Sequence, residues 1–301
     1  MKRRPIFATV LIILRAVSAW AEPGSAPRTV LVEGGSFFQG STEQPYAATE
    51  RVHLATLSPF EMAITETTQE LWTSVMGTNP SKFRSPAKPV DNVTWLDAVR
   101  FCNALSMREG LEPAYLIAGP EVGWNREADG YRLPTEAEWE FAARGGLSGA
   151  GSLVPLSKAP FAGGMEADKV AWYDKNSAKT TQAVATKLAN GLGLFDMSGN
   201  VWEWCWDWYG DYPRTDVVDP AGPAKGAGQK VLRGGAWFTP VNLLRVTYRY
   251  WNVPGFKVNS VGFRVAKNAP AVEVLEEVAV GDGSKLSAFD FLSVPASDPI
   301  R

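Results

Sequence analysis

The stretch that decides the fold lies between positions 193 and 204 and reads Gly193-Leu194-Phe195-Asp196-Met197-Ser198-Gly199-Asn200-Val201-Trp202-Glu203-Trp204. Its centre, Ser198-Gly199-Asn200, is typical of a turn. The aromatic run that follows extends to Tyr209, and the chain holds 12 Trp in all. Rings in this number pack a core in which regular secondary structure is sparse. The 28 Gly and 21 Pro likewise favour loops and short strands.

Upstream of this stretch, Thr135-Glu136-Ala137-Glu138 is a capping box that predicts a helix running through Phe141 to a stop at Gly145-Gly146. A second capping box, Thr67-Thr68-Gln69-Glu70, predicts a helix that ends at Gly77.

A third helix is expected after Thr94, which can cap it with Asp97 in the first turn. Val99, Cys102 and Leu105 then recur at helical spacing toward Gly110, so Cys102 is expected to face the core.

Short strands are expected between the helices, at Thr29–Val32, His53–Leu57, Val231–Leu232 and Gly262–Val265. The order shows no repeated strand-helix-strand period, which favours an α+β fold over a doubly wound sheet.

The composition excludes some classes of protein. With 301 residues and 45% hydrophobic content the chain can bury a sizeable core. The net charge of -2 supplies no basic field, so no nucleic-acid partner is expected.

The two ends differ from the middle. Basic residues 2–4, an apolar stretch and Ala19-Trp20-Ala21 predict a signal peptide at 1–21, and hence an exported protein, either periplasmic, at the cell surface or secreted. The alternative is a membrane anchor, but the apolar run is shorter than the ~20 residues that a span needs. No transmembrane span is therefore expected after cleavage. The domain is expected at 22–267, and 268–301 is interpreted as an acidic C-terminal extension.

Several strings together resemble the formylglycine-generating enzyme (sulfatase-modifying factor) family over about Thr29 to Lys267. They are the 193–204 stretch, Val32-Glu33-Gly34-Gly35-Ser36-Phe37, the segment 131–140, Leu232-Arg233-Gly234-Gly235-Ala236-Trp237 and Gly262-Phe263-Arg264. The resemblance implies one α+β domain of C-type-lectin-like topology. Family members include formylglycine generators, iron-dependent sulfoxide synthases and binding proteins diversified by retroelements, so membership leaves the chemistry open.

A formylglycine generator uses two cysteine thiolates after the Arg-Gly-Gly segment to hold Cu(I). The resemblance places Thr239 and Leu244 at those two positions, and neither can bind copper as a thiolate. An iron site of three histidines is also not expected, because His53 is the only histidine of the chain and is interpreted as a surface or packing residue. Neither copper nor iron is therefore expected.

Cys102 and Cys205 are the only cysteines. The family partner of the helix cysteine would follow Gly-Phe-Arg, where this chain has Val265. We therefore expect two buried thiols, with a disulfide between them as the alternative.

The resemblance also implies a structural calcium site in the 193–204 stretch. Asp196 and Glu203 would supply carboxylates and Gly199 and Val201 would supply carbonyl oxygens, which are the ligands that Ca²⁺ prefers. The alternative is a plain turn with Glu203 in a buried ion pair.

The segment between the Arg-Gly-Gly and Gly-Phe-Arg strings is rich in Tyr, Asn, Phe and small residues, a composition typical of an adaptable binding surface. It also resembles the variable region of the retroelement-diversified relatives. The candidate ligand-binding residues are Phe238, Thr239, Asn242, Tyr248, Tyr250, Trp251, Asn252 and Phe256. An ordinary family core is the competing interpretation, because sequence does not separate exposed from buried aromatics.

Two functions follow as hypotheses. The first is a non-catalytic exported protein that binds a protein or small-molecule ligand through residues 238–260. The second is a metal-dependent oxidoreductase or sulfatase-maturation relative that acts without the cysteine pair.

Overall fold

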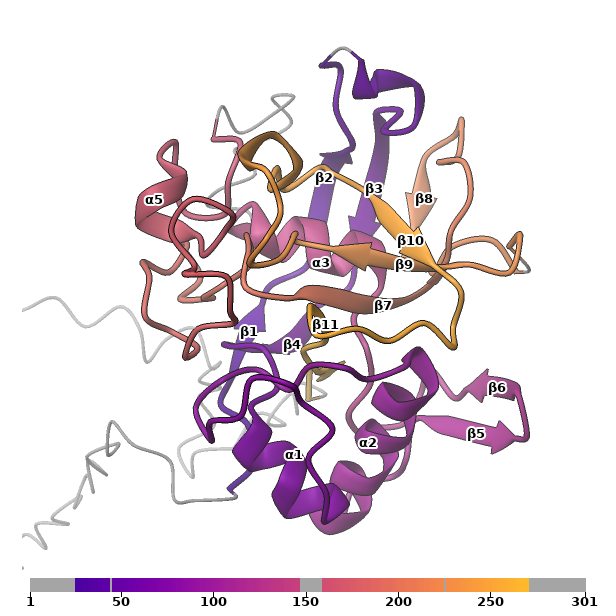
Figure 1. Ribbon diagram of the computed structural model, residues 1–301. Helices are drawn as coiled ribbons and strands as arrows, with labels where there is room; N and C mark the ends of the chain where they lie inside the picture. Colours follow the sequence, from indigo (N-terminus) through magenta and orange to yellow (C-terminus); the bar gives the residue numbers. More distant parts are fainter. Residues whose placement is uncertain (1–24, 44, 147–158, 225, 271–301) are drawn as a thin grey trace, which may run out of the picture. The chain divides into compact units, whose positions relative to one another are not determined.

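The computed structural model describes residues 25–43, 45–146, 159–224 and 226–270. The predicted signal peptide at 1–21 and the predicted extension from residue 271 onward lie outside these residues. The described residues up to Ala269 form part of one unit. Figure 1 shows how its short strands and helices are arranged.

The helices are α1 (Gln69–Met76), α2 (Trp95–Arg108), α3 (Glu136–Ala143) and the short α5 (Ala167–Val170), with single 3₁₀ turns η1 (Tyr46–Ala48) and η2 (Val241–Leu243). Both predicted caps at α2 and α3 are confirmed. The Thr94 hydroxyl accepts from the Asp97 amide while the Asp97 carboxylate accepts from the Thr94 amide. Thr135 and Glu138 form the same reciprocal pair.

The start of α1 differs by one residue from the prediction. Thr68, not Thr67, is the N-cap, and its hydroxyl accepts from the Leu71 amide at 3.2 Å. The reason is that the Thr67 backbone is already engaged: its amide donates to Phe263 and its carbonyl accepts from Val90. The helix ends as predicted at Gly77, whose φ of 73° is the left-handed conformation of a C-terminal cap.

The strands form four small sheets. Their orders are β1-β4-β12, β10-β9-β7-β11, β2-β3-β8 and the hairpin β5-β6. The bounds are β1 Thr29–Val32, β2 Gly35–Gln39, β3 His53–Leu57, β4 Phe60–Ala63, β5 Tyr115–Ala118, β6 Glu121–Trp124, β7 Trp202–Trp208, β8 Val217–Val218, β9 Lys230–Arg233, β10 Tyr250–Asn252, β11 Val261–Gly262 and β12 Ala266–Asn268. Short strands mixed with helices confirm the α+β class.

Three of the four predicted strands are confirmed, and the fourth is wrong in extent. The chain predicted as one strand at Gly262–Val265 leaves the β7 sheet after Gly262 and joins β4 from Ala266. Between them, the carbonyl of Phe263 accepts from Thr67 and that of Val265 accepts from Ala63. The segment therefore crosses from one sheet to another.

Strand β7 separates two halves of the core. Trp202 and Trp204 belong to the same core cluster as the apolar face of α2. Cys205 belongs to a second cluster, which includes Trp139 of α3. In Figure 1, β7 correspondingly lies between α3 on one side and α2 on the other. The aromatic run of the sequence is thus core packing, with Trp204 fully buried.

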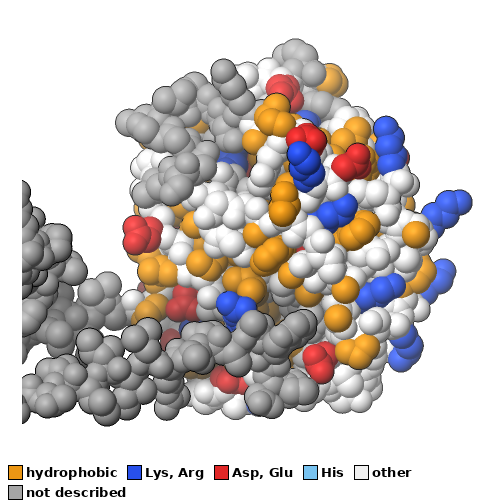
Figure 2. Space-filling view, turned by 90° about the vertical axis from the view of Figure 1, so that its left-hand side faces the viewer, with side chains coloured by type: hydrophobic (Ala, Val, Ile, Leu, Met, Phe, Trp, Pro, Cys, Tyr) orange, Lys and Arg blue, Asp and Glu red, His pale blue; other side chains and the backbone are white. Residues whose placement is uncertain are grey.

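The surface adds two observations. Figure 2 shows one face of the molecule, on which hydrophobic side chains are interspersed with polar and charged ones. Single exposed hydrophobic residues of this kind are ordinary in a folded protein. Within the described ranges, every helix is too short or too polar to cross a membrane.

Candidate functional site

The turn Arg233-Gly234-Gly235 opens the segment that the sequence predicts as a binding surface. Gly234 and Gly235 have φ values of 92° and 87°, which side chains rarely adopt. A Cβ atom at Gly235 would also lie 2.5 Å from the Leu244 side chain. Glycine is therefore required where the chain turns out of β9 into the segment.

The buried Arg233 side chain then fixes the far part of the segment. Its guanidinium donates to the Glu140 carboxylate at 2.6 Å and to the carbonyl oxygens of Val246, Thr247 and Tyr248. Burial by itself raises the pKa of Glu140, but the guanidiniums of Arg144 and Arg233 bring it below its usual value. The backbone of the segment is consequently tied to α3 by charged hydrogen bonds.

The predicted ligand-binding residues differ widely in exposure. Phe238 is 50% exposed, Trp251 is 39% exposed and Asn242 is exposed. Half-buried residues are Tyr248, Tyr250, Asn252 and Phe256. Thr239 is a correction, because it is buried and its hydroxyl accepts from the Ala236 amide at 2.9 Å, so it holds the turn and is not on the surface.

Aromatic rings from this segment form a continuous array with rings of β7 and the loop after it. Tyr250 contacts Trp202 at 5.0 Å between centroids and stacks at 6.4 Å on Trp251, which in turn contacts Tyr209 at 5.7 Å. Tyr248 also contacts Trp202, at 6.1 Å. The array therefore begins in the core and ends at an exposed indole.

A second aromatic group includes the other exposed ring. Phe238 packs edge-on against Trp237 at 5.2 Å, and Trp237 packs edge-on against Phe83 at 5.6 Å. The ammonium groups of Lys82 and Lys88 lie 5.8 and 5.7 Å from the Phe83 ring. Phe83 was missed by the sequence analysis because it lies 154 positions before Trp237.

The positions where the resemblance placed copper-binding cysteines are interior. Thr239 supports the turn, and Leu244 is fully buried beside Phe161. The chain's own two cysteines are free and fully buried, as expected, and they belong to different core clusters. Burial raises the pKa of both thiols.

The predicted calcium ligands are placed unequally. Asp196 has a φ of 57°, one carboxylate oxygen accepts from the Ala185 amide at 2.8 Å, and the other is buried without a hydrogen-bond partner among the described residues. That orphaned oxygen suits a cation. Both oxygens of Glu203 accept from Arg264, at 2.7 and 2.8 Å, and one also accepts from Trp139.

Glu66 joins this cluster, and no sequence pattern indicates it. Its carboxylate accepts from the Asn200 side chain at 2.7 Å and from the Val201 amide at 3.0 Å. Burial, followed by the charges of Asp196 and Glu203, raises the pKa of Glu66 well above its usual value. In the described ranges no three His, Cys, Asp or Glu side chains form a metal-binding group, so calcium here would depend on backbone carbonyls. Calcium binding by the predicted set stays a prediction, and the pairing of Glu203 counts against that residue as a ligand.

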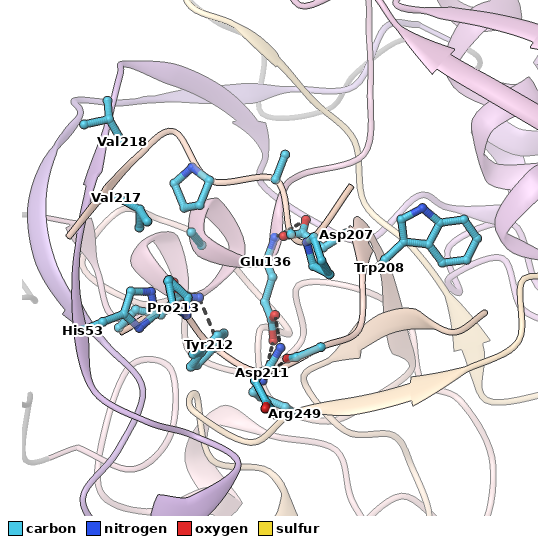
Figure 3. Close-up of a pocket in the computed structure, with 17 residues that line it drawn as sticks. His53, Glu136, Asp207, Trp208, Asp211, Tyr212, Pro213, Val217, Val218 and Arg249 are labelled. Carbon is cyan, nitrogen blue, oxygen red and sulfur yellow. Dashed lines mark hydrogen bonds and ion pairs between the residues drawn. The ribbon is translucent and has the colours of Figure 1, made fainter. Parts of the chain in front are cut away.

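A cavity of about 430 Å³ is lined in part by Arg249, the residue between Tyr248 and Tyr250 (Figure 3). Its wall includes the start of α3, the end of β7 and strand β8. His53 lines it, packed 4.8 Å from the Tyr212 ring with Nδ1 3.2 Å from the Arg51 carbonyl oxygen. The sequence analysis did not find this cavity because its residues come from five separate parts of the chain.

Comparisons with known proteins agree with this architecture. The family model described as the sulfatase-modifying factor enzyme 1-like domain matches residues 16–269. The chain is 34% identical over 297 residues to a Paenibacillus barcinonensis protein named chaperone protein LppX, covering 87% of this chain and 96% of that one. It is 35% identical over 219 residues to the Streptomyces coelicolor formylglycine-generating enzyme, covering 66% of this chain and 61% of the enzyme.

Among solved structures, Treponema denticola variable protein 1 superposes with a TM-score of 0.73 at 32% identity, covering 80% of this chain and 95% of that one. The structural neighbours confirm the C-type-lectin-like α+β fold. On the match of the family model to most of its length, the chain belongs to the family of sulfatase-modifying factor enzyme 1-like domains.

Proposed function

We propose that this protein is a non-catalytic, exported binding protein that recognises its ligand through the exposed side chains of residues 238–260. The observation that carries the proposal is the combination of exposed rings at Phe238 and Trp251 with a backbone fixed by the buried Arg233–Glu140 pair. Tyr and Trp give large contact area for few lost torsions, so a few such rings on a rigid frame can dominate binding.

A lack of redox chemistry is supported by the donor residues of the chain. Cu(I) is held by soft thiolates, and both cysteines lie in the core, in separate clusters. Thr239 and Leu244 are interior residues with packing roles. The competing function, sulfatase maturation of the formylglycine-generating type, would need a different set of reacting groups.

A protein partner is the favoured ligand. One relative covering 87% of the chain is named a chaperone, and the structural neighbour is named a variable protein. Both names fit a chain whose task is recognition. Calcium is kept as a proposed structural cofactor, with Asp196 as its best-supported ligand.

The test selects peptides from a displayed random library on the immobilised protein and measures their affinities for variants. Phe238→Ala or Trp251→Ala is expected to weaken binding at least tenfold, or about 1.4 kcal/mol. The matched control is Leu116→Ala, a 77% exposed side chain on β5 outside the segment. Selected peptides that bind equally well to the Phe238 and Trp251 variants would show that the segment is not the recognition surface.

A further inference from the structure

The cavity beside Arg249 carries an inference of its own. At about 430 Å³ it has the size of a small-ligand site. Neither Phe238 nor Trp251 lines it, and Arg249 is the lining residue that comes from the 238–260 segment. Figure 3 shows Glu136, Asp207 and Arg249 together along one side of it.

Among the lining residues, Asp207 gives the clearest indication of a ligand site. It is only 3% exposed and lines the cavity. One of its carboxyl oxygens accepts from the Glu136 amide at 2.9 Å. Among the described residues, the Glu136 amide is the one hydrogen-bond donor to this carboxyl group, so its other oxygen is left for a ligand. A buried carboxyl group that faces a cavity with an unused oxygen is a ready acceptor for a ligand donor.

The one guanidinium of the wall is already engaged. Arg249 donates through Nε and Nη2 to the two carboxylate oxygens of Glu136, both at 2.7 Å. Its Nη1 donates to the carbonyl oxygens of Thr49 and Gly210. Arg249 therefore has little capacity to hold an anion. The Tyr212 hydroxyl accepts from the Gln39 side-chain amide at 3.1 Å.

Acidic groups outnumber basic ones in the lining once Asp207 is ionised, and this favours a cation. Carboxyl groups come from Glu136, Asp207 and Asp211, whereas the basic side chains are Arg249, which is paired with Glu136, and His53. The lining also has an apolar wall, formed by Pro213, Val217, Pro220, Ala221 and Pro223. A short alkyl chain would bury apolar surface against this wall.

We propose that the cavity binds a primary alkylammonium group, with the ammonium at the free carboxyl oxygen of Asp207 and the alkyl chain along the apolar wall. The site is independent of the ligand surface at 238–260. The same chemistry is offered by a free alkylamine and by a lysine side chain of a partner.

Ligand entry is coupled to a proton. Burial, and then the charge of Glu136, raise the pKa of Asp207 to about 8. The other charged groups that face Asp207 are Glu138 of α3 and Lys230 of β9. The Lys230 ammonium donates to the Trp206 carbonyl at 2.7 Å and lies 3.8 Å from the Trp208 ring, and burial lowers its pKa to about 7. At pH 7 the empty site therefore holds a protonated Asp207, and binding of an ammonium releases that proton to solvent.

The experiment titrates the full protein with n-butylammonium, 1-butanol and butyrate, following ligand signals by NMR and heat in two buffers of different ionisation enthalpy. We expect saturable millimolar binding of n-butylammonium at least tenfold tighter than that of 1-butanol, with proton release at pH 7. Equal binding of butylammonium and butanol, preferred binding of butyrate, or no saturable binding of butylammonium would overturn the proposal. This comparison needs no variant.

A variant pair locates the site. Asp207→Asn keeps an acceptor for the Glu136 amide, and is expected to weaken butylammonium binding at least tenfold and abolish proton release. Asp216→Asn, an exposed change in the loop between β7 and β8 and outside the lining, should bind like the parent. Unchanged binding by Asp207→Asn contradicts the site. An Nα-acetyl-lysine amide arm separates the sources: binding of this probe too assigns a partner's lysine, whereas butylammonium alone assigns a free amine.

Discussion

Three buried guanidiniums of the described residues are paired with carboxylates, whereas the buried Asp207 has no such pair. Arg233 with Glu140, Arg249 with Glu136 and Arg264 with Glu203 form ion pairs whose members are all at most 8% exposed. Such pairs satisfy each other's hydrogen-bonding groups, and removing one partner leaves an uncompensated charge in the core. Asp207 is equally buried, and burial, followed by the charge of Glu136, raises its pKa.

The first prediction concerns Asp207 and pH. Its folded pKa of about 8 exceeds its ordinary value of 3.8, so the folded state binds the proton more tightly than the unfolded state. The stability from the protonated carboxyl is complete below pH ~4 and is lost as pH rises toward 8, with a slope of up to ~1.4 kcal/mol per pH unit. Asp207→Asn, which does not titrate, should gain stability over the parent across this window, as measured by urea unfolding at several pH values. A constant difference between the two proteins from pH 4 to 8 would contradict the shifted pKa.

The second prediction separates Asp196 from Glu203. If calcium binds at the orphaned oxygen of Asp196, excess calcium raises the melting temperature of the parent relative to chelator, because the metal binds only the folded state. Asp196→Asn should abolish that response, because it removes the negative charge from the proposed ligand. The fold should be kept, since asparagine tolerates the left-handed backbone and still accepts from the Ala185 amide.

Glu203→Gln should behave differently. It leaves Arg264 buried without its counter-charge, so a loss of ~3–5 kcal/mol is expected in chelator and in calcium alike. Retention of the calcium response in this variant supports Glu203 as an ion-pair partner. Loss of the response in both variants supports the four-ligand set implied by the resemblance. A parent protein that melts at the same temperature in both conditions has no such site.

At the scale of elements, the sequence predicted those features that depend on interactions between neighbouring residues, such as helix caps. The caps of Thr94 and Thr135 and the stop at Gly77 were predicted because they depend on neighbouring residues alone. The one-residue error at Thr67 and the broken strand after Gly262 arose from backbone hydrogen bonds to segments distant in sequence.

The candidate site was predicted less well than the helices. Composition identified the 238–260 segment, but it could not distinguish the exposed Trp251 from the buried Thr239. Glu66 and the cavity around Asp207 gave no sequence signal, because they assemble only when separate parts of the chain fold together.

The third prediction tests how much the Thr135 N-cap stabilises helix α3. Thr135→Ala removes the hydroxyl that accepts from the Glu138 amide, and a loss of ~1 kcal/mol in the free energy of unfolding is expected. Thr135→Ser keeps the acceptor and serves as the control, with little change expected. Equal losses in both variants would mean that packing of the buried Thr135 methyl group, and not the cap, stabilises α3.

At the scale of the whole molecule, one scaffold of this family carries different chemistries, and the side chains of this chain decide among them. The chain is similar in sequence to a formylglycine-generating enzyme. Its two thiols, Cys102 and Cys205, are nevertheless buried in the core. The proposed export depends on the signal peptide predicted at residues 1–21. Expression in a secreting host should yield a mature protein that begins at Glu22, as read by N-terminal mass analysis, and a protein that keeps residue 1 would contradict the signal peptide.

The last prediction is that the purified protein does not convert the cysteine of a sulfatase-type peptide to formylglycine, even with copper and oxygen supplied. The reaction in the family type depends on two thiolates close together on the copper, and soft ligands are what Cu(I) requires. Here Thr239 and Leu244 occupy those positions in the interior, and both thiols of the chain are inaccessible. Peptide mass spectrometry over a long incubation measures the outcome, with an active formylglycine-generating enzyme on the same peptide as the positive control. Conversion by the parent that is lost in Cys102→Ala or Cys205→Ala would mean that a core thiol reaches the substrate, and the protein would then be an enzyme.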